Sequence, residues 1–346
     1  MAYTTINKGS DYFNTVLYTG NGGTNNITGV EFQPDLVWIK NRNSTNEHCV
    51  TDVVRGATKY LHTNLTQAET TAANSLTSFD SDGFSLGNNA NFNTNTNTYV
   101  AWNWLADNTS GSSNTDGSIT STVSSNTTSG FSIVTYTGTG VSETIGHGLG
   151  AVPNVIIVKG SSGTSAVDGW YTYHSSVGNT KFVELNNTGG ATTFSTMWDN
   201  TTPTTTTFST TYLSKASTNY VAYFFAEKKG FSKFGGYTGN GSTDGTFVYT
   251  GFKPAFVMTK ESATTGSWNI FDNRRENPFN VVKGNLKAES SIAEESNTNL
   301  QMDFVSNAFK LRGTGGDLNG SGTAMIYMAF AENPFVTSTG IPTTVR

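Results

Sequence analysis

Charged side chains are scarce in this sequence of 346 residues. Asp, Glu, Lys and Arg make up 13% of it, against about 25% in an ordinary globular protein. Apolar residues do not fill the deficit, since they account for only 35%. Thr, Asn, Ser and 37 glycines take the place of the charges. We therefore expect a surface that is wetted by hydroxyl and amide groups.

Several functional classes are excluded by what is missing. The formal net charge of -5 and the pI near 5.4 leave no basic surface of the kind that displaces counterions from nucleic acid. No apolar run approaches the roughly 20 residues of a membrane helix, so membrane insertion is not expected. The opening sequence MAYTTINKGSDYF predicts no signal peptide. The single cysteine, Cys49, excludes an internal disulfide and indicates synthesis in a reducing cytoplasm.

Aromatic residues are plentiful at 12%, which argues against a disordered chain. Runs of aromatic and β-branched residues alternate with polar turns, as in FDSDGFSLG from Phe79 to Gly87, and this pattern is typical of β-hairpins. Two stretches, 65–74 and 286–297, are predicted to form one or two helical turns each. The fold class predicted from these patterns is all-β and antiparallel.

The same set of sequence features occurs three times. A YTG turn begins at Tyr18, Tyr136 and Tyr237, at separations of 118 and 101 residues. A strand that starts at a proline and ends at a lysine follows each turn. Each copy closes with a segment that is apolar on both faces of the expected strand (YVAWNW, YVAYFF or MIYMAF). A period near 100 residues indicates tandem domains, because small solenoid repeats are much shorter.

The repeats predict three tandem β-sandwiches of jelly-roll type. Repeats 2 and 3 follow each other without a spacer and are expected to dock rigidly, whereas a Ser/Thr/Gly linker before repeat 2 is expected to be flexible or extended. The predicted boundaries are an N-terminal arm (1–12), repeat 1 (13–108), a linker (109–130), repeat 2 (131–229), repeat 3 (230–336) and a C-terminal tail (337–346).

No catalytic, metal or cofactor site is predicted. The four histidines lack the spacing of a helical zinc site and are interpreted as surface or turn residues. Asp272, Glu289, Glu294 and Glu295 form the only acidic cluster with the composition of a glycosidase site. Part of this cluster recurs in repeat 1, with Asp52, Arg55 and Glu69 at the offsets of Asp272, Arg275 and Glu289, while repeat 2 has His174 at the aspartate position. We interpret the recurrence as structural ion pairs, so the chain is not expected to be an enzyme.

Trp170 and Trp268 are the candidate ligand-binding residues. They follow Gly- and Ser-rich loops at matching positions in repeats 2 and 3. An indole exposed at the rim of a sandwich stacks well on a sugar ring. Burial at the start of a strand is the alternative interpretation of both residues.

The motifs of repeats 1 and 3 resemble a repeated domain of virion proteins from tailed bacteriophages, especially marine and cyanobacterial phages. In repeat 1 the resemblance rests on YTGNG, PDLVWIK, VRGATKYL, SFDSDGFSLG and YVAWNW, and in repeat 3 on GFKPAFVMTKES, GSWNIFDNRREN, SNAFKLRG and IYMAFAENPF. Repeat 2 keeps only the opening and the closing motifs. The resemblance carries no catalytic residues.

This resemblance implies a virion structural protein, assembled in the host cytoplasm and exposed on the particle exterior. The function that we expect is that of a tail fibre or receptor-binding subunit in host adsorption. A capsid decoration or head-fibre protein is the first alternative, and a polysaccharide-degrading tail enzyme is the second. The expected partners are other virion proteins that bind the N-terminal arm, further copies of the chain in a trimer, and a glycan of the host surface.

Overall fold

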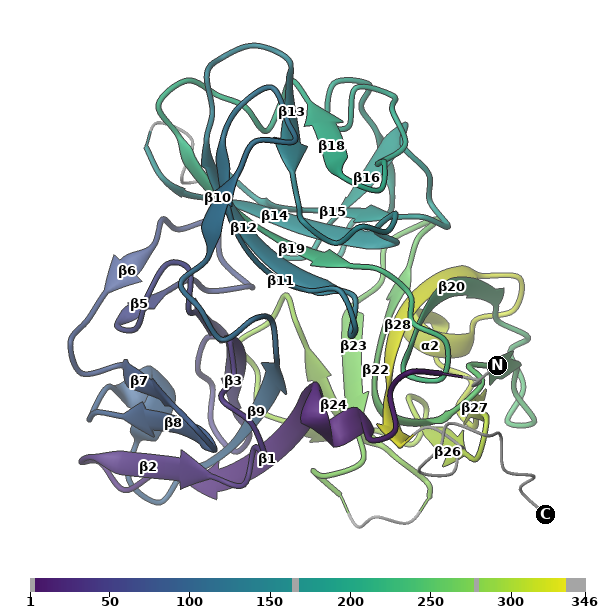
Figure 1. Ribbon diagram of the computed structural model, residues 1–346. Coiled ribbons are helices and arrows are strands. Elements are labelled where there is room, and N and C mark those ends of the chain that lie inside the picture. The colour runs from purple at the N-terminus through teal and green to yellow at the C-terminus, as the bar shows by residue number, and fades with distance from the viewer. Residues whose placement is uncertain (1–3, 164–167, 277–279, 334–346) are drawn as a thin grey trace.

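The computed structural model describes residues 4–163, 168–276 and 280–333, and within them the chain is an all-β protein with antiparallel strand ladders, as the sequence predicted (Figure 1). Helix is limited in these residues to the short segments η1 (Gly9–Asp11), α1 (Ala90–Asn93) and α2 (Gly316–Asn319). Neither stretch predicted as helical turns is helical, since both consist of irregular backbone, turns and short strand segments. Each of the two stretches makes a backbone hydrogen bond to a neighbouring repeat.

Each repeat is built on one large sheet with the closing strand near its middle. The closing strands are β9 (Thr98–Trp104), β19 (Asn219–Phe225) and β28 (Ala324–Asn333). Each pairs on one side with the opening strand and on the other with the strand that follows the proline. The flanking strands are β1 (Phe13–Thr19) and β3 (Leu36–Asn41), β12 (Phe131–Thr137) and β14 (Val155–Ser162), and β20 (Ser232–Thr238) and β22 (Lys253–Glu261). A central position explains why the closing segments are apolar on both faces.

The large sheets continue outward through shorter strands. These are β4 (Cys49–Asp52) with the pair β5 (Lys59–Tyr60) and β6 (Thr70–Thr71) in repeat 1, β15 (Trp170–His174), β16 (Lys181–Glu184) and β17 (Thr192–Thr193) in repeat 2, and β23 (Trp268–Asp272), β24 (Gly284–Lys287) and β25 (Glu295–Ser296) in repeat 3. A backbone bridge from Val50 to Leu61 links β4 to β5. The three large sheets therefore share one strand order.

A small sheet belongs to each repeat and gives it the second layer expected of a sandwich. The small sheets are β2 (Asn25–Thr28), β8 (Gly83–Leu86) and β7 (Leu76–Asp80) in repeat 1, β13 (Glu143–Gly146) and β18 (Thr207–Thr210) in repeat 2, and β21 (Phe247–Tyr249), β27 (Ala308–Leu311) and β26 (Met302–Val305) in repeat 3. The predicted hairpin at FDSDGFSLG is the β7–β8 pair. A two-layer arrangement is consistent with a sandwich, and the division into three domains stays a prediction.

The predicted flexible linker is wrong. Residues 109–130 contain β10 (Ser112–Asn114) and β11 (Ser121–Asn126), and β11 pairs with β12 along the edge of the large sheet of repeat 2. Val123 is buried in the core of repeat 2, and Asn126 donates a hydrogen bond to the carbonyl of Ala106 at 3.0 Å. The segment between repeats 1 and 2 thus packs on both of them, although only repeats 2 and 3 were expected to dock.

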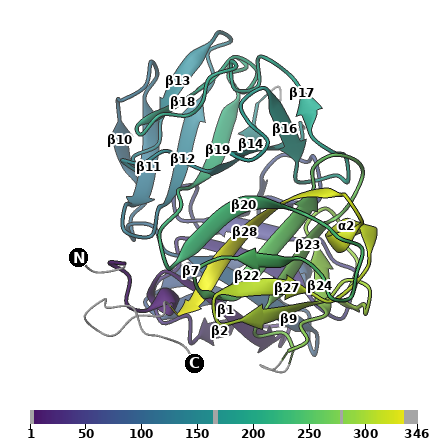
Figure 2. The same ribbon diagram turned by 90° about the vertical axis from the view of Figure 1, so that its right-hand side faces the viewer.

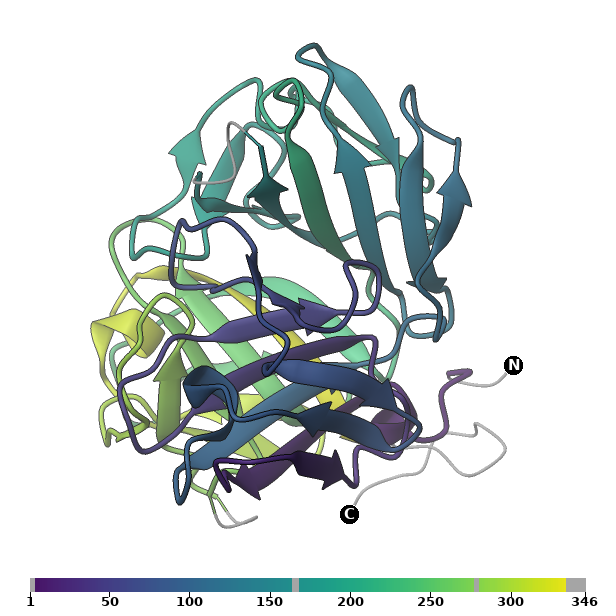
Figure 3. The ribbon, with the colours of Figure 1, turned by 90° about the vertical axis from the view of Figure 1, so that its left-hand side faces the viewer.

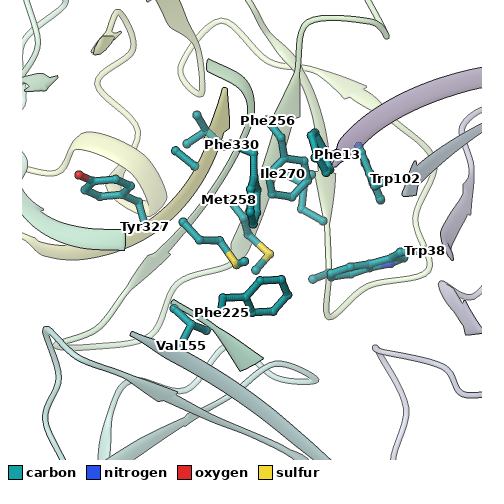
Figure 4. Packing of buried hydrophobic residues seen from close by; sticks show 14 of the residues in the cluster. Phe13, Trp38, Trp102, Val155, Phe225, Phe256, Met258, Ile270, Tyr327 and Phe330 are labelled. Carbon is teal, nitrogen blue, oxygen red and sulfur yellow. The ribbon is translucent and has the colours of Figure 1, made fainter. Parts of the chain in front are cut away.

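The inner faces of the three large sheets meet in one central core. Trp104, Phe225 and Phe330 have the same position in the three closing strands, and their ring centroids lie 6.2, 5.7 and 5.9 Å apart. Figure 4 shows Phe225 of repeat 2 and Phe330 of repeat 3 among the residues of this core. A cavity of only about 20 Å³ remains between the repeats, which is roughly the space of one water molecule. This shared core makes the three repeats one packed body.

The N-terminal arm packs on the chain itself. Ile6 is buried in the central core, and the ring of Tyr12 lies edge-on to Phe231 of repeat 3 with centroids 5.9 Å apart. The backbone nitrogen of Leu105 donates to the carbonyl of Tyr12 at 3.0 Å. Residues 4–12 therefore join repeat 1 to repeat 3, and the predicted tail 337–346 lies outside the described residues.

Candidate functional site

Successive repeats are joined by an equivalent backbone hydrogen bond at each of three boundaries. In each bond, a backbone N–H of one repeat donates to a backbone carbonyl of the next repeat. That carbonyl belongs to the residue two positions after the lysine of the repeated strand, at or just after the end of the strand. The bonds are Glu69 N to Ser161 O (2.8 Å), Ala191 N to Ser262 O (2.8 Å) and Glu294 N to Arg42 O (2.7 Å). The third bond joins repeat 3 back to repeat 1, so the repeats close into a ring.

The lysines that end the repeated strands lie inside this ring. Lys40, Lys159 and Lys260 are all fully buried. Lys159 donates to the carbonyl of Thr66 in repeat 1 at 3.2 Å, and Lys260 donates to the carbonyl of Thr188 in repeat 2 at 3.1 Å. Burial lowers the pKa of each lysine to about 8. Their ammonium groups bind backbone carbonyls, so these lysines are structural.

The boundary between repeats 1 and 2 contains a buried ionic cluster. Arg55 Nε binds Asp52 Oδ2 at 2.5 Å, and Arg55 Nη1 binds Glu69 at 3.0 Å. Tyr223 of repeat 2 donates its hydroxyl to the same Asp52 oxygen at 2.7 Å. The Asp52 and Arg55 side chains are at most 4% exposed. The buried carboxylate and guanidinium groups therefore have hydrogen-bonded partners of opposite charge, as buried ions require.

The boundary between repeats 3 and 1 repeats this cluster. Arg275 Nε binds Asp272 Oδ2 at 2.6 Å, and Arg275 Nη1 lies 3.6 Å from Glu294. Trp102 of repeat 1 donates its indole N–H to Asp272 at 3.0 Å. Burial alone would raise the pKa of Asp272, but the charge of Arg275 and the hydrogen bonds from Arg275 and Trp102 outweigh it and lower that pKa. The predicted pairing of both aspartates with an arginine is therefore observed.

Repeat 2 departs from this pattern on both sides of its boundary with repeat 3. His174 stands in place of the aspartate, Val177 in place of the arginine, and Met328 in place of the donor from the next repeat. His174 Nδ1 accepts from the backbone of Ser176 at 3.1 Å, and Nε2 lies 3.1 Å from the carbonyl oxygen of Tyr327. Burial lowers the pKa of His174 to about 4. At the boundary between repeats 2 and 3, a carboxylate would find neither an arginine nor a donor from the next repeat. A neutral histidine takes its place there.

The remaining carboxylates of the acidic cluster also have partners. Glu289 accepts from the backbone N–H of Trp268 at 3.0 Å, and Glu295 binds Lys287 at 3.0 Å. A glycosidase needs two carboxyl groups that face a substrate across a cleft, one of them free to donate a proton. The cluster in repeat 3 instead serves ion pairs and backbone contacts.

Trp170 and Trp268 do not form a surface site. Trp170 is 1% exposed and Trp268 is 3% exposed. Each indole N–H donates at 2.8 Å to a backbone carbonyl of the preceding repeat, from Trp170 to His62 and from Trp268 to Glu184. The prediction that they bind a ligand is corrected here, because an indole held between repeats has no free face for a sugar ring.

The surface between repeats 1 and 2 has a polar groove of about 390 Å³. Figure 3 shows the two repeats from this side, with repeat 1 in purple and blue below repeat 2 in teal. Repeat 1 supplies Val54, Arg55, Lys59 and Glu69, and repeat 2 with its preceding segment supplies Thr120, Ser121, Thr122, Thr135, Tyr136, Thr137, Ser161, Ser162, Asn219 and Tyr220. The volume lies within the range of small-molecule sites.

One wall of this groove comes from the segment that was predicted to be a linker. Thr122 on β11 and Thr135 on β12 are cross-strand partners, so their side chains lie on the same face of the sheet. Both are half-buried, and within the described ranges neither hydroxyl has a hydrogen-bond partner in the protein. Among the described residues, a strand in the position of β11 occurs beside repeat 2 and not beside repeats 1 and 3. This site could not be predicted from the sequence, because a Ser- and Thr-rich strand has the composition of a linker.

The charges at the groove are largely fixed. Arg55 is 4% exposed and Glu69 is 15% exposed, and they bind each other, whereas Lys59 is 45% exposed and lies 3.8 Å from Glu69. A ligand in the groove therefore meets mostly hydroxyl groups and one accessible ammonium group. Such a lining suits a neutral or weakly acidic ligand with many hydroxyls.

Metal and membrane sites find no support in the described part of the chain. No group of three or more His, Cys, Asp or Glu side chains there is placed to hold a metal ion. The four histidines were interpreted as surface or turn residues. They do not lie on the surface, because His48, His62, His147 and His174 are all buried. Among the described helices, none is long and apolar enough to span a membrane.

Comparison with known proteins adds one finding. No curated protein and no solved structure matches the chain significantly. One family model matches residues 8–334, and this match begins in the N-terminal arm and covers all three repeats. The unit that the family model describes is therefore the complete ring. The chain belongs to the family described as Domain of unknown function (DUF7483).

Proposed function

We propose that this chain is a structural protein of a bacteriophage virion that binds a saccharide of the host surface, in the manner of a tail fibre or receptor-binding subunit. The resemblance of repeats 1 and 3 to virion domains supports the virion assignment, and so does a surface of uncharged polar residues. The hydroxyl-lined groove between repeats 1 and 2 is the observation that carries the binding role.

The lining of the groove favours a saccharide over other small ligands. An apolar ligand would leave the hydroxyls of Thr122 and Thr135 without partners, at a cost in binding free energy. A phosphate would meet only one accessible cation, Lys59, where several charge-assisted bonds are usual. The hydroxyls of a sugar both donate and accept, as the threonine hydroxyls do.

Binding without hydrolysis fits the state of the carboxylates. Asp52, Glu69, Asp272 and Glu294 all bind buried arginines. A carboxylate that is occupied by a buried arginine is not placed to face a substrate across a cleft, as the acid and base of a glycosidase must be. We therefore propose a non-enzymatic role, and release of sugar from envelope material by the purified chain would overturn it.

A capsid decoration protein is the second candidate, and the compact ring favours it. The expectation of a tail fibre rested partly on a flexible linker that would give reach, and residues 109–130 are instead strands in a sheet. Attachment to other virion proteins and assembly of three copies remain part of the proposal. Residues 4–12 already pack on the ring, so attachment through the arm needs surfaces beyond the buried side chain of Ile6.

The saccharide-binding role is tested by removing the groove hydroxyls. T122V and T135V keep the β-branched shape of the side chains, and T28V removes an exposed hydroxyl from β2 as a matched control. We expect the purified chain to bind members of an array of bacterial surface polysaccharides. The double groove variant should bind about tenfold more weakly, which corresponds to about 1.4 kcal/mol. Equal binding by all variants would contradict the site.

The position in the particle is tested separately. Electron microscopy of intact particles labelled with an antibody against the chain should place it on the tail if it is a fibre. Label on empty, tailless capsids would instead select the decoration protein. A chain absent from purified particles would overturn the virion assignment.

A further inference from the structure

Two aromatic side chains lie exposed on the outer sheet of repeat 3. Phe247 is 51% exposed and Tyr249 is 59% exposed. They stand two residues apart on β21, with buried Val248 between them, so both rings lie on the outward face about 7 Å apart along the strand. Among the described residues, neither ring contacts another aromatic ring. Together they form a surface that we call the β21 platform.

The other two repeats show that the fold does not need aromatic residues at these positions. The inward residue of the strand pairs with a phenylalanine in every repeat, as Ile27 with Phe84, Ile145 with Phe208 and Val248 with Phe309. The residues on either side of it are Asn26 and Thr28 in repeat 1, Thr144 and Gly146 in repeat 2, and Phe247 and Tyr249 in repeat 3. Asn26 and Thr28 are exposed, so repeat 1 shows that polar residues suffice.

Hydrogen-bonding groups border the platform on the same face. Lys310 is the cross-strand partner of Phe247 and binds Asp244 at 2.6 Å. Asp303 is the next residue across the sheet and binds Arg312 at 2.5 Å. Two rings beside paired charges offer an apolar surface for stacking and polar atoms at its edge. Asp244 is 84% exposed and available to further donors.

We infer that the β21 platform is a second saccharide-binding site, on which two neighbouring sugar rings stack on Phe247 and Tyr249. The apolar face of a sugar ring packs on an aromatic ring, while its hydroxyls reach the charged groups beside Phe247. A protein partner fits less well, because two half-exposed rings offer on the order of 200 Å² of contact area, against about 800 Å² on each partner of a stable interface.

The platform and the groove lie on different parts of the ring. The platform belongs to the small sheet that contains β26 and β27, and the groove is lined by residues of β5 and β11. In Figure 1, β26 and β27 lie at the lower right and β5 lies at the left. Figure 2 shows β27 on the lower half of the side that faces the viewer. A chain with two such sites binds a long polysaccharide more tightly than either site alone through effective concentration. This inference rests on the proposed saccharide-binding function.

The test replaces the platform with the residues that repeat 1 has at the same positions. F247N/Y249T should fold with an unchanged melting temperature, because the same fold accepts Asn26 and Thr28. Binding to the array of bacterial surface polysaccharides should fall at least tenfold. F247Y/Y249F should keep the affinity, and V141T, which alters another exposed apolar residue (60% exposed), should be neutral.

The outcomes separate the two proposals. If the wild-type chain binds no polysaccharide, the proposed function fails and the platform inference fails with it. If the wild-type chain binds and F247N/Y249T binds equally well, the platform inference is overturned while the groove remains. Loss of attachment to a virion protein, without loss of polysaccharide binding, would also overturn it and assign the platform to a protein contact.

Discussion

Tyr223 of repeat 2 donates its hydroxyl to Asp52 of repeat 1, with 2.7 Å between the two oxygen atoms. The equivalent residue of repeat 1, Trp102, donates to Asp272 of repeat 3 at 3.0 Å. Both aspartates are buried and bound to an arginine three residues later. The closing strand of one repeat thus completes the ionic cluster of its neighbour, and this dependence makes the boundaries testable one at a time.

Replacing Tyr223 by phenylalanine should destabilise the protein by about 2 kcal/mol, because Asp52 loses a buried hydrogen bond to a charged group. The ring stays in place, so packing changes little. Urea denaturation followed by tryptophan fluorescence measures the loss. Y249F is the matched control, since Tyr249 is exposed and has no ring partner among the described residues. Equal stability of Y223F and the wild type would show that Arg55 alone satisfies Asp52.

Introducing an aspartate at His174 should cost about 3 kcal/mol or more, because the carboxylate would be buried without an arginine or a donor. Val177 and Met328 stand where the other boundaries have these groups. The variant V177R should be destabilising alone but should restore part of the stability of H174D. A double-mutant cycle in urea measures this coupling. If the stability losses of H174D and V177R simply add in the double variant, the aspartate and the arginine do not stabilise each other at this boundary.

The repeats, the strand-rich fold and the paired acids could be predicted because each leaves a short motif in the sequence, such as Asp52 with Arg55 three residues later. The YTG motif shows why. Tyr18 donates its hydroxyl to the carbonyl of Phe92 at 2.7 Å, and a side chain on Gly20 would lie 2.1 Å from the carbonyl oxygen of Thr94. Gly138 and Gly239 approach backbone carbonyls in the same way. A motif with such steric demands recurs in recognisable form.

The closure of the ring and the groove could not be predicted from the sequence. Each boundary bond joins residues about 70 to 250 positions apart, such as Glu69 with Ser161, and no local pattern encodes such a pairing. The strand β11 has Val123 as its one buried apolar residue, so its sequence reads like a linker. Trp170 and Trp268 follow loops but turn inward, because the neighbouring repeat covers them.

Replacing Lys260 by methionine should give a stability difference from the wild type that depends on pH. Burial lowers the pKa of Lys260 in the folded chain to about 8 from 10.5, so between these values the unfolded chain binds more protons. The stability of the wild type relative to K260M should therefore rise as the pH increases from 8 towards 10. Below pH 8 the full penalty of the buried charge is present.

Denaturant titrations at pH 7.5, 8.5 and 9.5 measure this trend for Lys260. K181M serves as the control for the loss of a lysine side chain as such, because Lys181 on β16 is exposed and carries no buried charge. A constant difference between the wild type and K260M would mean that the ammonium group is as well solvated by the carbonyls of Thr188 and Glu261 as it is by water.

The shared core predicts that the whole chain unfolds in one cooperative transition. Trp104, Phe225 and Phe330 contact one another across all three boundaries, so a single repeat cannot leave without exposing the apolar faces of the other two. Scanning calorimetry should give one peak with a calorimetric enthalpy close to the van't Hoff enthalpy. Three separate peaks would instead show that the repeats are independent domains.

The variant W104A tests the same cooperativity from inside the core. Truncating a buried tryptophan costs about 3–5 kcal/mol, and in one cooperative unit that loss reaches every strand. Hydrogen exchange should therefore speed up in β19 and β28 as much as in β9, although Trp104 belongs to β9 alone. Faster exchange confined to repeat 1 would mean that the repeats unfold separately. In that case the match of one family model to residues 8–334 would reflect three domains inherited together, and not one folding unit.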